Sequence, residues 1–586
     1  MGAETARPWP APERPGNVGA LKRLSMPSRL SGKRWSTRGC SQGLFRNAGS
    51  DATVCPDRRN RRLRSGRRRQ RGRCARWRES AWFYWNKNLL EGWISSRPVS
   101  VRLFDRPCLA RTYGGCEQSI EYHADMAGLQ YWHVGSQTPL AGRIEMPRLM
   151  IIQAASYRGF GDRRPLKIRK RRLIGAVLPY MGALAPRDWD VTLVDDAVEE
   201  VDFDAPVDVV AITARMVTSL RAQELADKFR ERGVTVLMGG PHATFYAEEM
   251  AQHADGVCIG EAEEIFPQML EDAAAGRLKQ FYQRDTVASM KGMPTPRWDL
   301  LHPENYTFYS PVVIQQSRGC PYTCDFCAER RLNGDYGYRD RPAEEIVEEI
   351  RKSGKRHVFF AASQFVGHKK RTMELLEALI PLKIRWSALF SPRFGLDGEF
   401  LDLAQRSGLL HVNMGIESIS QTTLKSMHKE FNKSNSYDEM IDNLNRRNIS
   451  FSFNFVFGTD TDDETVFDAT LQFLQQHKVP AAYFNVLAPL RGTPVYDRLK
   501  AENRIIDEPN MDRWPGVYCH IEPRNMSGQQ LVAKVQKLQR EFYSLRAITQ
   551  RLRVPRTQAD FASWNVNMTQ RKVALNSDKL CEFSEF

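Results

Sequence analysis

Residues 317–327 read Ser-Arg-Gly-Cys-Pro-Tyr-Thr-Cys-Asp-Phe-Cys and are the most informative segment of the chain. It holds three cysteines in the spacing C-x3-C-x2-C and follows the apolar segment 312–314, Val-Val-Ile. Three thiolates on one tight loop suit three corners of a [4Fe–4S] cube, because thiolates are the usual ligands of such clusters. The fourth iron then lacks a protein ligand and can chelate a small molecule through an amine and a carboxylate.

Other kinds of cysteine site fit this spacing less well. Structural zinc sites commonly use two separated ligand pairs, whereas the nearest other cysteines, Cys258 and Cys519, are far away in the sequence. Disulfide scaffolds are typical of small secreted domains, not of 586 residues with 11 cysteines. Ferredoxin spacings place a fourth cysteine in register, and none follows here. We therefore predict Cys320, Cys324 and Cys327 as metal ligands.

The triplet resembles the cluster-binding loop of the radical S-adenosylmethionine (SAM) enzymes. In that family the cluster gives one electron to SAM, which breaks into methionine and a 5′-deoxyadenosyl radical. The resemblance implies a [4Fe–4S] cluster and SAM as cofactors, and an oxygen-sensitive enzyme.

The positive charge of the chain lies at one end. The formal net charge is +16. Residues 1–145 hold 27 Lys and Arg against 11 Asp and Glu, so they carry all of this charge and the rest of the chain is neutral. A net positive charge would favour a nucleic-acid partner if it were spread over a folded domain. Because it is not, we predict no nucleic-acid partner.

Residues 1–145 are predicted to be a disordered basic extension, since they show no sustained helical or strand period. Three interpretations compete: an arm that binds RNA or acidic surfaces, an organelle transit peptide, or a segment outside the native protein. We favour the last, with translation starting at Met146, because the first convincing strand and the end of the charge imbalance both lie there.

Residues 146–285 alternate apolar runs with amphipathic helices. The expected strands are 149–152, 191–195, 207–213, 234–238 and 256–260, and two of the expected helices are 173–185 and 220–232. Leu220, Leu225 and Phe229 are expected on one face of the second helix. Such alternation predicts a doubly wound, Rossmann-like parallel α/β sheet with ligand loops at the carboxyl ends of its strands.

This domain resembles the cobalamin-binding module of the B12-dependent radical SAM proteins, the branch of the anaerobic tetrapyrrole cyclases and hopanoid methylases. Residues 239–244, Gly-Gly-Pro-His-Ala-Thr, and 260–263, Gly-Glu-Ala-Glu, carry the resemblance. It implies that cobalamin lies beside Gly239, Gly240, His242 and Gly260, where glycines let the backbone approach a ligand. The first loop, residues 155–161, has no histidine to ligate cobalt. A domain that binds nothing stays open as the alternative.

After a proline-containing linker at 286–306, residues 307–510 predict the radical SAM core. Strands are expected at 312–314, 357–361, 384–389, 411–415, 450–457 and 482–487, with helical stretches between them. Six βα units suit a partial (β/α)6 TIM-type barrel with its chemistry at the carboxyl-terminal rim. A helix at 529–552 belongs to a helical C-terminal segment, residues 511–586, of the kind that closes substrate pockets in this family.

The resemblance assigns roles to several rim residues. Phe326 is expected near the adenine, Glu417 at the ribose or amino group of SAM, and Gly458 against the adenine. The usual Gly-Gly-Glu after the second strand is missing, so Ser363 is the predicted contact of the SAM amine. Arg393 is the predicted bidentate donor to the methionyl carboxylate. Plain packing or surface roles are the alternatives for Phe326, Glu417 and Arg393.

We therefore predict a cytoplasmic radical SAM enzyme that uses cobalamin to methylate an unactivated carbon of a small-molecule or lipid substrate. An electron donor such as flavodoxin or ferredoxin is expected. No apolar run is long enough for a transmembrane segment. The alternatives are a radical cyclase or oxidoreductase without methyl transfer, and a basic RNA-binding protein. A methylthiotransferase would need three more cysteines upstream, where residues 146–285 have only Cys258.

Overall fold

The first domain is built on a six-stranded parallel sheet. The computed structural model describes residues 146–576 apart from 160–161, 334–336, 507 and 509–515. The sheet has the order β4-β1-β5-β6-β7-β8. Its strands are β1 (Arg148–Gln153), β4 (Asp190–Asp195), β5 (Val209–Thr213), β6 (Thr235–Gly239), β7 (Gly256–Ile259) and β8 (Phe281–Gln283). Short apolar runs suit such strands, because a parallel sheet is covered on both faces.

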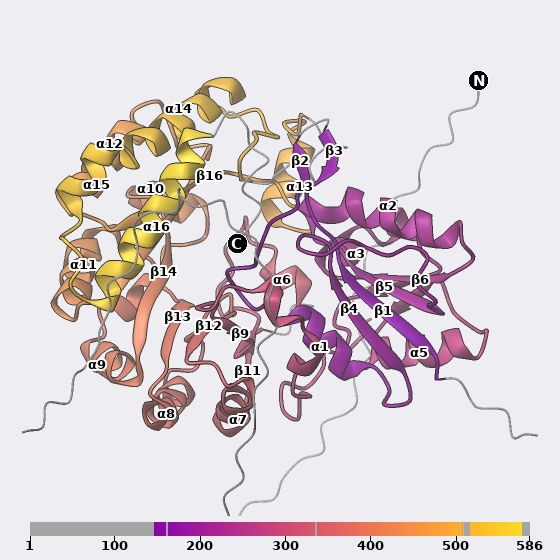
Figure 1. The fold of residues 1–586 in the computed structure, drawn as a ribbon. Coiled ribbons are helices and arrows are strands. Elements are labelled where there is room, and N and C mark those ends of the chain that lie inside the picture. The colour runs from indigo at the N-terminus through magenta and orange to yellow at the C-terminus, as the bar shows by residue number, and fades with distance from the viewer. Residues whose placement is uncertain (1–145, 160–161, 334–336, 507, 509–515, 577–586) are drawn as a thin grey trace, which may run out of the picture. The chain divides into compact units, whose positions relative to one another are not determined.

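Two separate apolar cores cover the faces of this sheet. Alternate residues of β1 divide between them: Met150 and Ile152 join one cluster, and Leu149 and Ile151 join the other. Helix α2 (Ser219–Arg230) contributes to the first cluster, and helices α1 (Val177–Leu184) and α5 (Ile265–Ala274) contribute to the second. Figure 1 shows α2 and α5 on opposite sides of the strands. The predicted doubly wound sheet is confirmed.

The second domain contains a six-stranded parallel sheet whose strands follow chain order, β9-β12-β13-β14-β15-β16. The strands are β9 (Val312–Ile314), β12 (His357–Phe360), β13 (Arg385–Leu389), β14 (Leu409–Glu417), β15 (Ser450–Phe457) and β16 (Ala481–Val486). The main helices between them are α7 (Ala343–Ser353), α8 (Lys369–Leu379), α9 (Gly398–Ser407), α11 (Tyr437–Arg446) and α12 (Val466–Gln476). Sequential parallel strands that end in two edges form an open barrel, as predicted.

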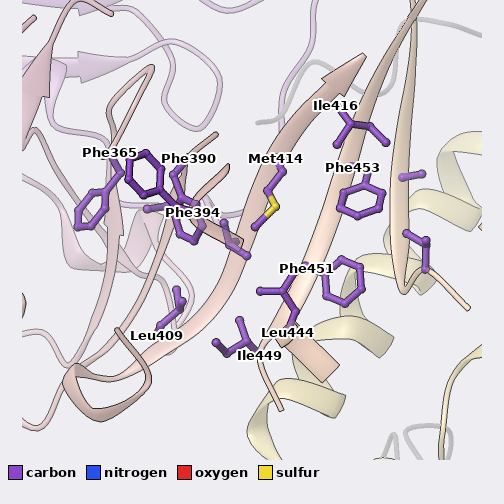
Figure 2. Packing of buried hydrophobic residues seen from close by; sticks show 14 of the residues in the cluster. Phe365, Phe390, Phe394, Leu409, Met414, Ile416, Leu444, Ile449, Phe451 and Phe453 are labelled. Carbon is purple, nitrogen blue, oxygen red and sulfur yellow. The ribbon is translucent and has the colours of Figure 1, made fainter. Parts of the chain in front are cut away.

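Large aromatic and aliphatic side chains fill the core of this barrel. Phe451, Phe453 and Trp386 are completely buried, and the Trp386 indole nitrogen donates to Ser407 Oγ over 3.1 Å. Met414 on β14 stands opposite Phe453 on β15 in the ladder, and Figure 2 shows both in the packed cluster. Tight packing of this kind holds the strand ends, and hence the loops that follow them, in fixed positions.

The C-terminal segment differs from the prediction of one long helix. Helix α14 (Gly528–Phe542) ends before Ser544, and α15 (Leu545–Arg551) begins after it. Ser544 has extended backbone angles, and its hydroxyl accepts from the Ala547 amide as a helix cap. A third helix, α16 (Gln558–Leu575), lies against the barrel strands, and its Ser563 bonds Ser450 of β15 over 2.8 Å.

Three smaller expectations are corrected as well. Leu220 is 46% exposed although Leu225 and Phe229 of the same helix are fully buried, because five residues advance a helix well past one full turn. Helix α1 starts at Val177 rather than at 173, since Ile174 is extended and pairs with Val312 of the barrel. Strand β8 was not expected.

Several predictions concern residues outside those that the structure describes. The basic extension at 1–145 is one, and the greater part of the segment 511–518 is another. The described residues all belong to one compact unit, Tyr131–Phe586. Within the described part of the chain, no helix combines the length and the apolar character that a membrane span requires. The exact domain bounds given above stay predictions.

Replacing Phe453 by alanine tests the barrel core. We expect Phe453→Ala to lower the free energy of unfolding by about 3–5 kcal/mol, the usual cost of deleting a buried aromatic ring. Phe308→Ala is the matched control, because Phe308 is 87% exposed, and we expect a change within about 0.5 kcal/mol. Urea unfolding followed by circular dichroism measures both. Equal losses in the two variants would contradict the packing described.

Candidate active site

The cysteine loop leaves the barrel from a small two-stranded ribbon. Strand β10 (Ser317–Arg318) pairs antiparallel with β11 (Arg339–Asp340), with Arg318 opposite Arg339. Gly319 follows with φ 79°, and the Gly337 carbonyl occupies the place where a side chain would stand. Only glycine fits this position without strain, so the ribbon fixes where the loop starts.

The three thiols of the loop are partly buried and free of disulfides. Burial raises the pKa of each thiol, that of Cys324 to about 12. The Cys327 charge adds to this effect at Cys320 and Cys324, whereas the Lys429 cation opposes it at all three. The thiols therefore lie close enough to influence one another electrostatically, beside a shared cation.

The donor set of this loop fits a [4Fe–4S] cluster. Thiolates are the ligands that such clusters take, and one loop presents all three, with a cation nearby that favours the thiolate form. Among the residues that the structure describes, no three His, Cys, Asp or Glu side chains already meet in a metal-binding group. The fit consequently rests on the thiol chemistry and the shared loop.

Contacts from two other parts of the barrel hold the loop. The Asp325 amide donates to the Met427 carbonyl over 3.3 Å, and the Val495 amide donates to the Asp325 carbonyl over 3.1 Å. The Tyr322 ring stacks on Phe431, with centroids 3.8 Å apart and planes 9° from parallel. The segment after β14 therefore supports the loop from one side, and the helix after β16 supports it from the other.

A buried ion pair joins the end of β14 to the cysteine loop. Lys429 Nζ lies 2.5 Å from Glu417 Oε1, and the two side chains are 11% and 8% exposed. The lysine also lies over the rings of Phe326 and Phe431, 5.7 and 5.8 Å from their centroids. Burial alone would lower the Lys429 pKa, but the negative charges of Glu417 and the cysteines raise it. Lys429 is thus a fixed cation.

The barrel rim holds the other predicted SAM contacts at strand ends. Glu417 ends β14 with φ 60°, a conformation that costs a non-glycine residue about 1–3 kcal/mol and is common at functional sites. Phe326 packs against the apolar cluster of Leu487 and Val495. Gly458 follows β15 and lies against Leu531 of α14. The contacts of these three residues with SAM stay predictions.

Ser363 and Arg393 are less closely tied to the cysteine loop. Both are exposed, Ser363 in the loop after β12 and Arg393 in the turn after β13. The Arg393 guanidinium lies 5.1 Å from the Phe394 ring centroid. Lys429, in contrast, is a buried cation whose charge influences all three cysteines. The contact of Arg393 with the methionyl carboxylate stays a prediction.

The residues predicted for cobalamin gather at the carboxyl ends of β6 and β7. Gly239 ends β6, and Gly240 follows with φ 96°. A side chain on Gly240 would come within 2.9 Å of the Ala214 carbonyl, so the turn needs glycine. Gly260 follows β7, and its amide donates to Thr244 Oγ1 over 3.1 Å. His242 is 2% exposed and stacks on Tyr246, with centroids 4.5 Å apart.

Four charged side chains join this edge of the first sheet to the start of the cysteine loop. Arg318 pairs with Glu261 over 3.1 Å and with Glu263. Arg339 donates to both oxygens of Glu261, over 2.5 and 3.1 Å. We call Glu261, Glu263, Arg318 and Arg339 the arginine–glutamate cluster. Their side chains are 11–16% exposed.

Comparison with known proteins defines the class to which this arrangement belongs. Residues 314–473 match the model of the radical SAM superfamily, and residues 180–270 match the B12 binding domain. Bacteriochlorophyllide d C-12(1)-methyltransferase of Chlorobaculum tepidum is 31% identical over 410 residues, which is 68% of this chain and 88% of that protein. The chain therefore belongs to the B12-binding radical SAM enzymes, and its cofactors are a [4Fe–4S] cluster, SAM and cobalamin.

Two further similarities agree with this family. Bacteriochlorophyllide d C-8(2)-methyltransferase of the same organism is 28% identical over 65% of this chain and 87% of its own length. The solved cobalamin-dependent SAM radical enzyme OxsB, with aqua-cobalamin and SAM bound, has a TM-score of 0.55 at 16% identity, covering 73% of this chain and 72% of that one. This last likeness shows the fold. The predicted family, fold class and cofactors are confirmed.

Sequence reasoning missed two parts of the site. Lys429 lies 12 residues after Glu417, within a polar stretch that resembles many surface segments. The arginine–glutamate cluster joins residues 55 to 78 positions apart. Its one sequence signal was the presence of two acids in the Gly-Glu-Ala-Glu loop and an arginine two residues before Cys320.

Removing one thiol tests the cluster ligands. We expect Cys324→Ala to lose most of the iron that the wild-type protein holds after anaerobic reconstitution, because two thiolates cannot replace three on this loop. Cys519→Ala is the matched control, since Cys519 is also a partly buried free thiol. Iron and sulfide per chain are the measurement. Full iron content in Cys324→Ala would exclude the proposed ligand set.

Replacing Lys429 tests the buried cation. We expect Lys429→Met to slow 5′-deoxyadenosine formation from SAM by about tenfold or more, since charge-assisted contacts contribute roughly 1.5–3 kcal/mol. Lys425→Met, at an exposed position of the preceding helix, should match the wild type. Rates are normalised to bound iron. A normal rate in Lys429→Met would show that this cation does not assist SAM.

Proposed function

We propose that the protein is a cobalamin-dependent C-methyltransferase that adds a methyl group to an unactivated carbon of a small molecule. The observation that carries this proposal is the arginine–glutamate cluster. Arg318, two residues before Cys320, pairs with Glu261 and Glu263, which lie one and three residues after Gly260. The source of the radical and the source of the methyl group thus belong to segments in direct contact.

When bound, the cofactors would supply the reactive groups: the [4Fe–4S] cluster would provide the electron that cleaves one SAM molecule to methionine and a 5′-deoxyadenosyl radical. Cobalamin would provide a methyl group that it receives from a second SAM molecule. The protein orients these groups and excludes water. Cys320, Cys324 and Cys327 hold the cluster, and Lys429 faces the SAM carboxylate. The strained turn at Glu417 presents its carboxylate to the SAM ribose or amine.

The remaining predicted residues have supporting roles in this proposal. Phe326 and Gly458 border the adenine, and Ser363 faces the SAM amine at the rim. The loops after β6 and β7 receive cobalamin through the residues predicted above: Gly239, Gly240, His242 and Gly260. His242 is buried, and its Nε2 lies 3.6 Å from Glu249 Oε1. The imidazole is therefore held at this sheet edge by Glu249 and by the Tyr246 ring.

We further propose a chlorophyllide-type tetrapyrrole as the substrate class, because two relatives are named for methylation of bacteriochlorophyllide d. A lipid substrate is the alternative that the experiment must separate. A small electron-transfer protein such as flavodoxin or ferredoxin supplies the electrons, and the cytoplasm is the expected location. The family assignment removes an RNA-binding protein as the main function.

Isotope transfer tests the proposal. We expect the anaerobically reconstituted protein, given SAM labelled with ¹³C at the methyl group and bacteriochlorophyllide d, to form a pigment heavier by one labelled methylene unit. The methyl group replaces a hydrogen atom, and that hydrogen appears in 5′-deoxyadenosine. Mass spectrometry follows both products.

The controls separate the competing functions. A hopanoid lipid replaces the pigment in a parallel reaction. Label found in the lipid and not in the pigment would show that the substrate is a lipid and not a tetrapyrrole. Deoxyadenosine formed with a pigment that is altered but unlabelled would favour a cyclase or oxidoreductase over a methyltransferase. Cys324→Ala should give neither product.

A further inference from the structure

The arginine–glutamate cluster has a feature that simple adhesion between two domains does not need. It attaches to the protein at four backbone points that border the cofactor loops. Glu261 and Glu263 follow the end of β7, and Arg318 and Arg339 stand opposite each other in the β10–β11 ribbon. The ribbon continues directly through Gly319 into Cys320. We therefore expect a shift of the Glu261 and Glu263 carboxylates to move Cys320, the first predicted ligand of the [4Fe–4S] cluster.

Neighbouring side chains hold the four charged groups in place. Tyr180 of α1 donates to Glu263 Oε1 over 2.8 Å. Gln315 accepts from Arg318 over 2.9 and 3.0 Å. Asn333 accepts from Arg339 over 3.2 Å and donates to Glu329, which in turn accepts from the Gly319 amide over 3.1 Å. Each arginine is thus bound on more than one side, which limits it to one orientation.

Stability alone is a weak reason for such a cluster. Burying four charged groups carries a desolvation penalty that the ion pairs barely offset, and apolar replacements are often neutral or stabilising. Planar arginine–carboxylate pairs, in contrast, define both distance and angle. A buried charged cluster between two cofactor loops is therefore better suited to setting geometry than to holding domains together.

A second contact links the same sheet edge to the barrel by different chemistry. The Arg491 guanidinium, in the loop after β16, lies 4.4 Å from the Tyr246 ring centroid. Tyr246 stacks in turn on His242 after β6. Because this stack does not involve the arginine–glutamate cluster, we expect the domains to stay associated when that cluster is altered.

We infer that Glu261, Glu263, Arg318 and Arg339 are positioning residues that set the distance between bound cobalamin and the cluster on the cysteine loop. The inference rests on the proposed function and deepens it. In the coupled reaction, a carbon–hydrogen bond of the substrate would break, and its hydrogen atom would join the 5′-carbon of deoxyadenosine. A carbon–carbon bond would then form between the substrate carbon and the methyl group as the bond between that methyl group and cobalt breaks. If the distance between cobalamin and the [4Fe–4S] cluster were wrong, the hydrogen atom would still be removed from the substrate but the methyl group would not be transferred.

The test uses full-length protein loaded with iron, sulfide and hydroxocobalamin under anaerobic conditions. Its main measurement is independent of substrate: the reduced cluster accelerates the spin relaxation of cob(II)alamin, an effect that falls steeply with distance. Glu263→Gln removes the charge, and Glu263→Asp keeps it while shortening the link by one methylene. Glu264→Gln is the matched control, because Glu264 forms an exposed pair with Arg284 in the same loop.

We expect Glu263→Asp to keep its iron, corrin and melting temperature but to change the relaxation enhancement, and Glu263→Gln to change it further. With bacteriochlorophyllide d present, methyl transfer per SAM cleaved should fall about tenfold or more, since a misplacement of one ångström can cost that much or more. Glu264→Gln should match the wild type. If the Glu263→Gln variant loses its iron, the relaxation enhancement of Glu263→Asp alone tests the positioning role.

The outcomes separate this inference from the proposed function. Unchanged relaxation in Glu263→Asp and Glu263→Gln would overturn the positioning role while leaving methylation intact. Altered relaxation in a protein that never labels its substrate would support positioning and defeat the methyltransferase proposal. A lower melting temperature together with the wild-type spin relaxation of cob(II)alamin would show that the arginine–glutamate cluster contributes to stability only.

Discussion

Parallel strand order is the constraint on which the rest of this molecule depends. A parallel strand can be followed by another only through a crossover, so the carboxyl ends of all strands in a sheet meet at one edge. In the first sheet this edge collects the glycines after β6 and β7, and in the barrel it collects the cysteine loop, Glu417 and Gly458. Residues as far apart in the chain as Cys320 and Gly458 therefore contribute to one rim of the barrel without specific long-range instructions in the sequence.

Local pattern predicted the architecture well, for a physical reason. Buried parallel strands are short apolar runs between turn residues, and β15 was located to the residue because its aromatic run Phe451, Phe453, Phe455 and Phe457 is unbroken by charge. The cysteine spacing is equally local, since three ligands on one loop need no distant partner. The break at Ser544 was missed because a serine cap within a helical pattern looks like any exposed serine until its backbone is extended.

The electrostatic part of the site could not be read in the same way. Lys429 and Glu417 meet because β14 and the segment after its helix turn back on each other, and no period in the sequence reports that turn. The partners of Glu261 and Glu263 come from a different domain. Charged residues are usually solvated, and only burial distinguishes those that are paired. Arg393, predicted for its chemistry, is exposed, and its contact with SAM stays a prediction. Lys429 is buried beside the cysteines, and no sequence pattern had indicated it.

The extended segment around Ile174 has a mechanical consequence. Its backbone bonds run to the chain that enters β9: the Ile174 amide donates to the Pro311 carbonyl over 2.9 Å, and the Val313 amide donates back to Ile174 over 2.9 Å. An edge strand normally presents unpaired backbone groups, and here the first domain covers that edge. Any motion that separated the two domains would have to break these two backbone hydrogen bonds.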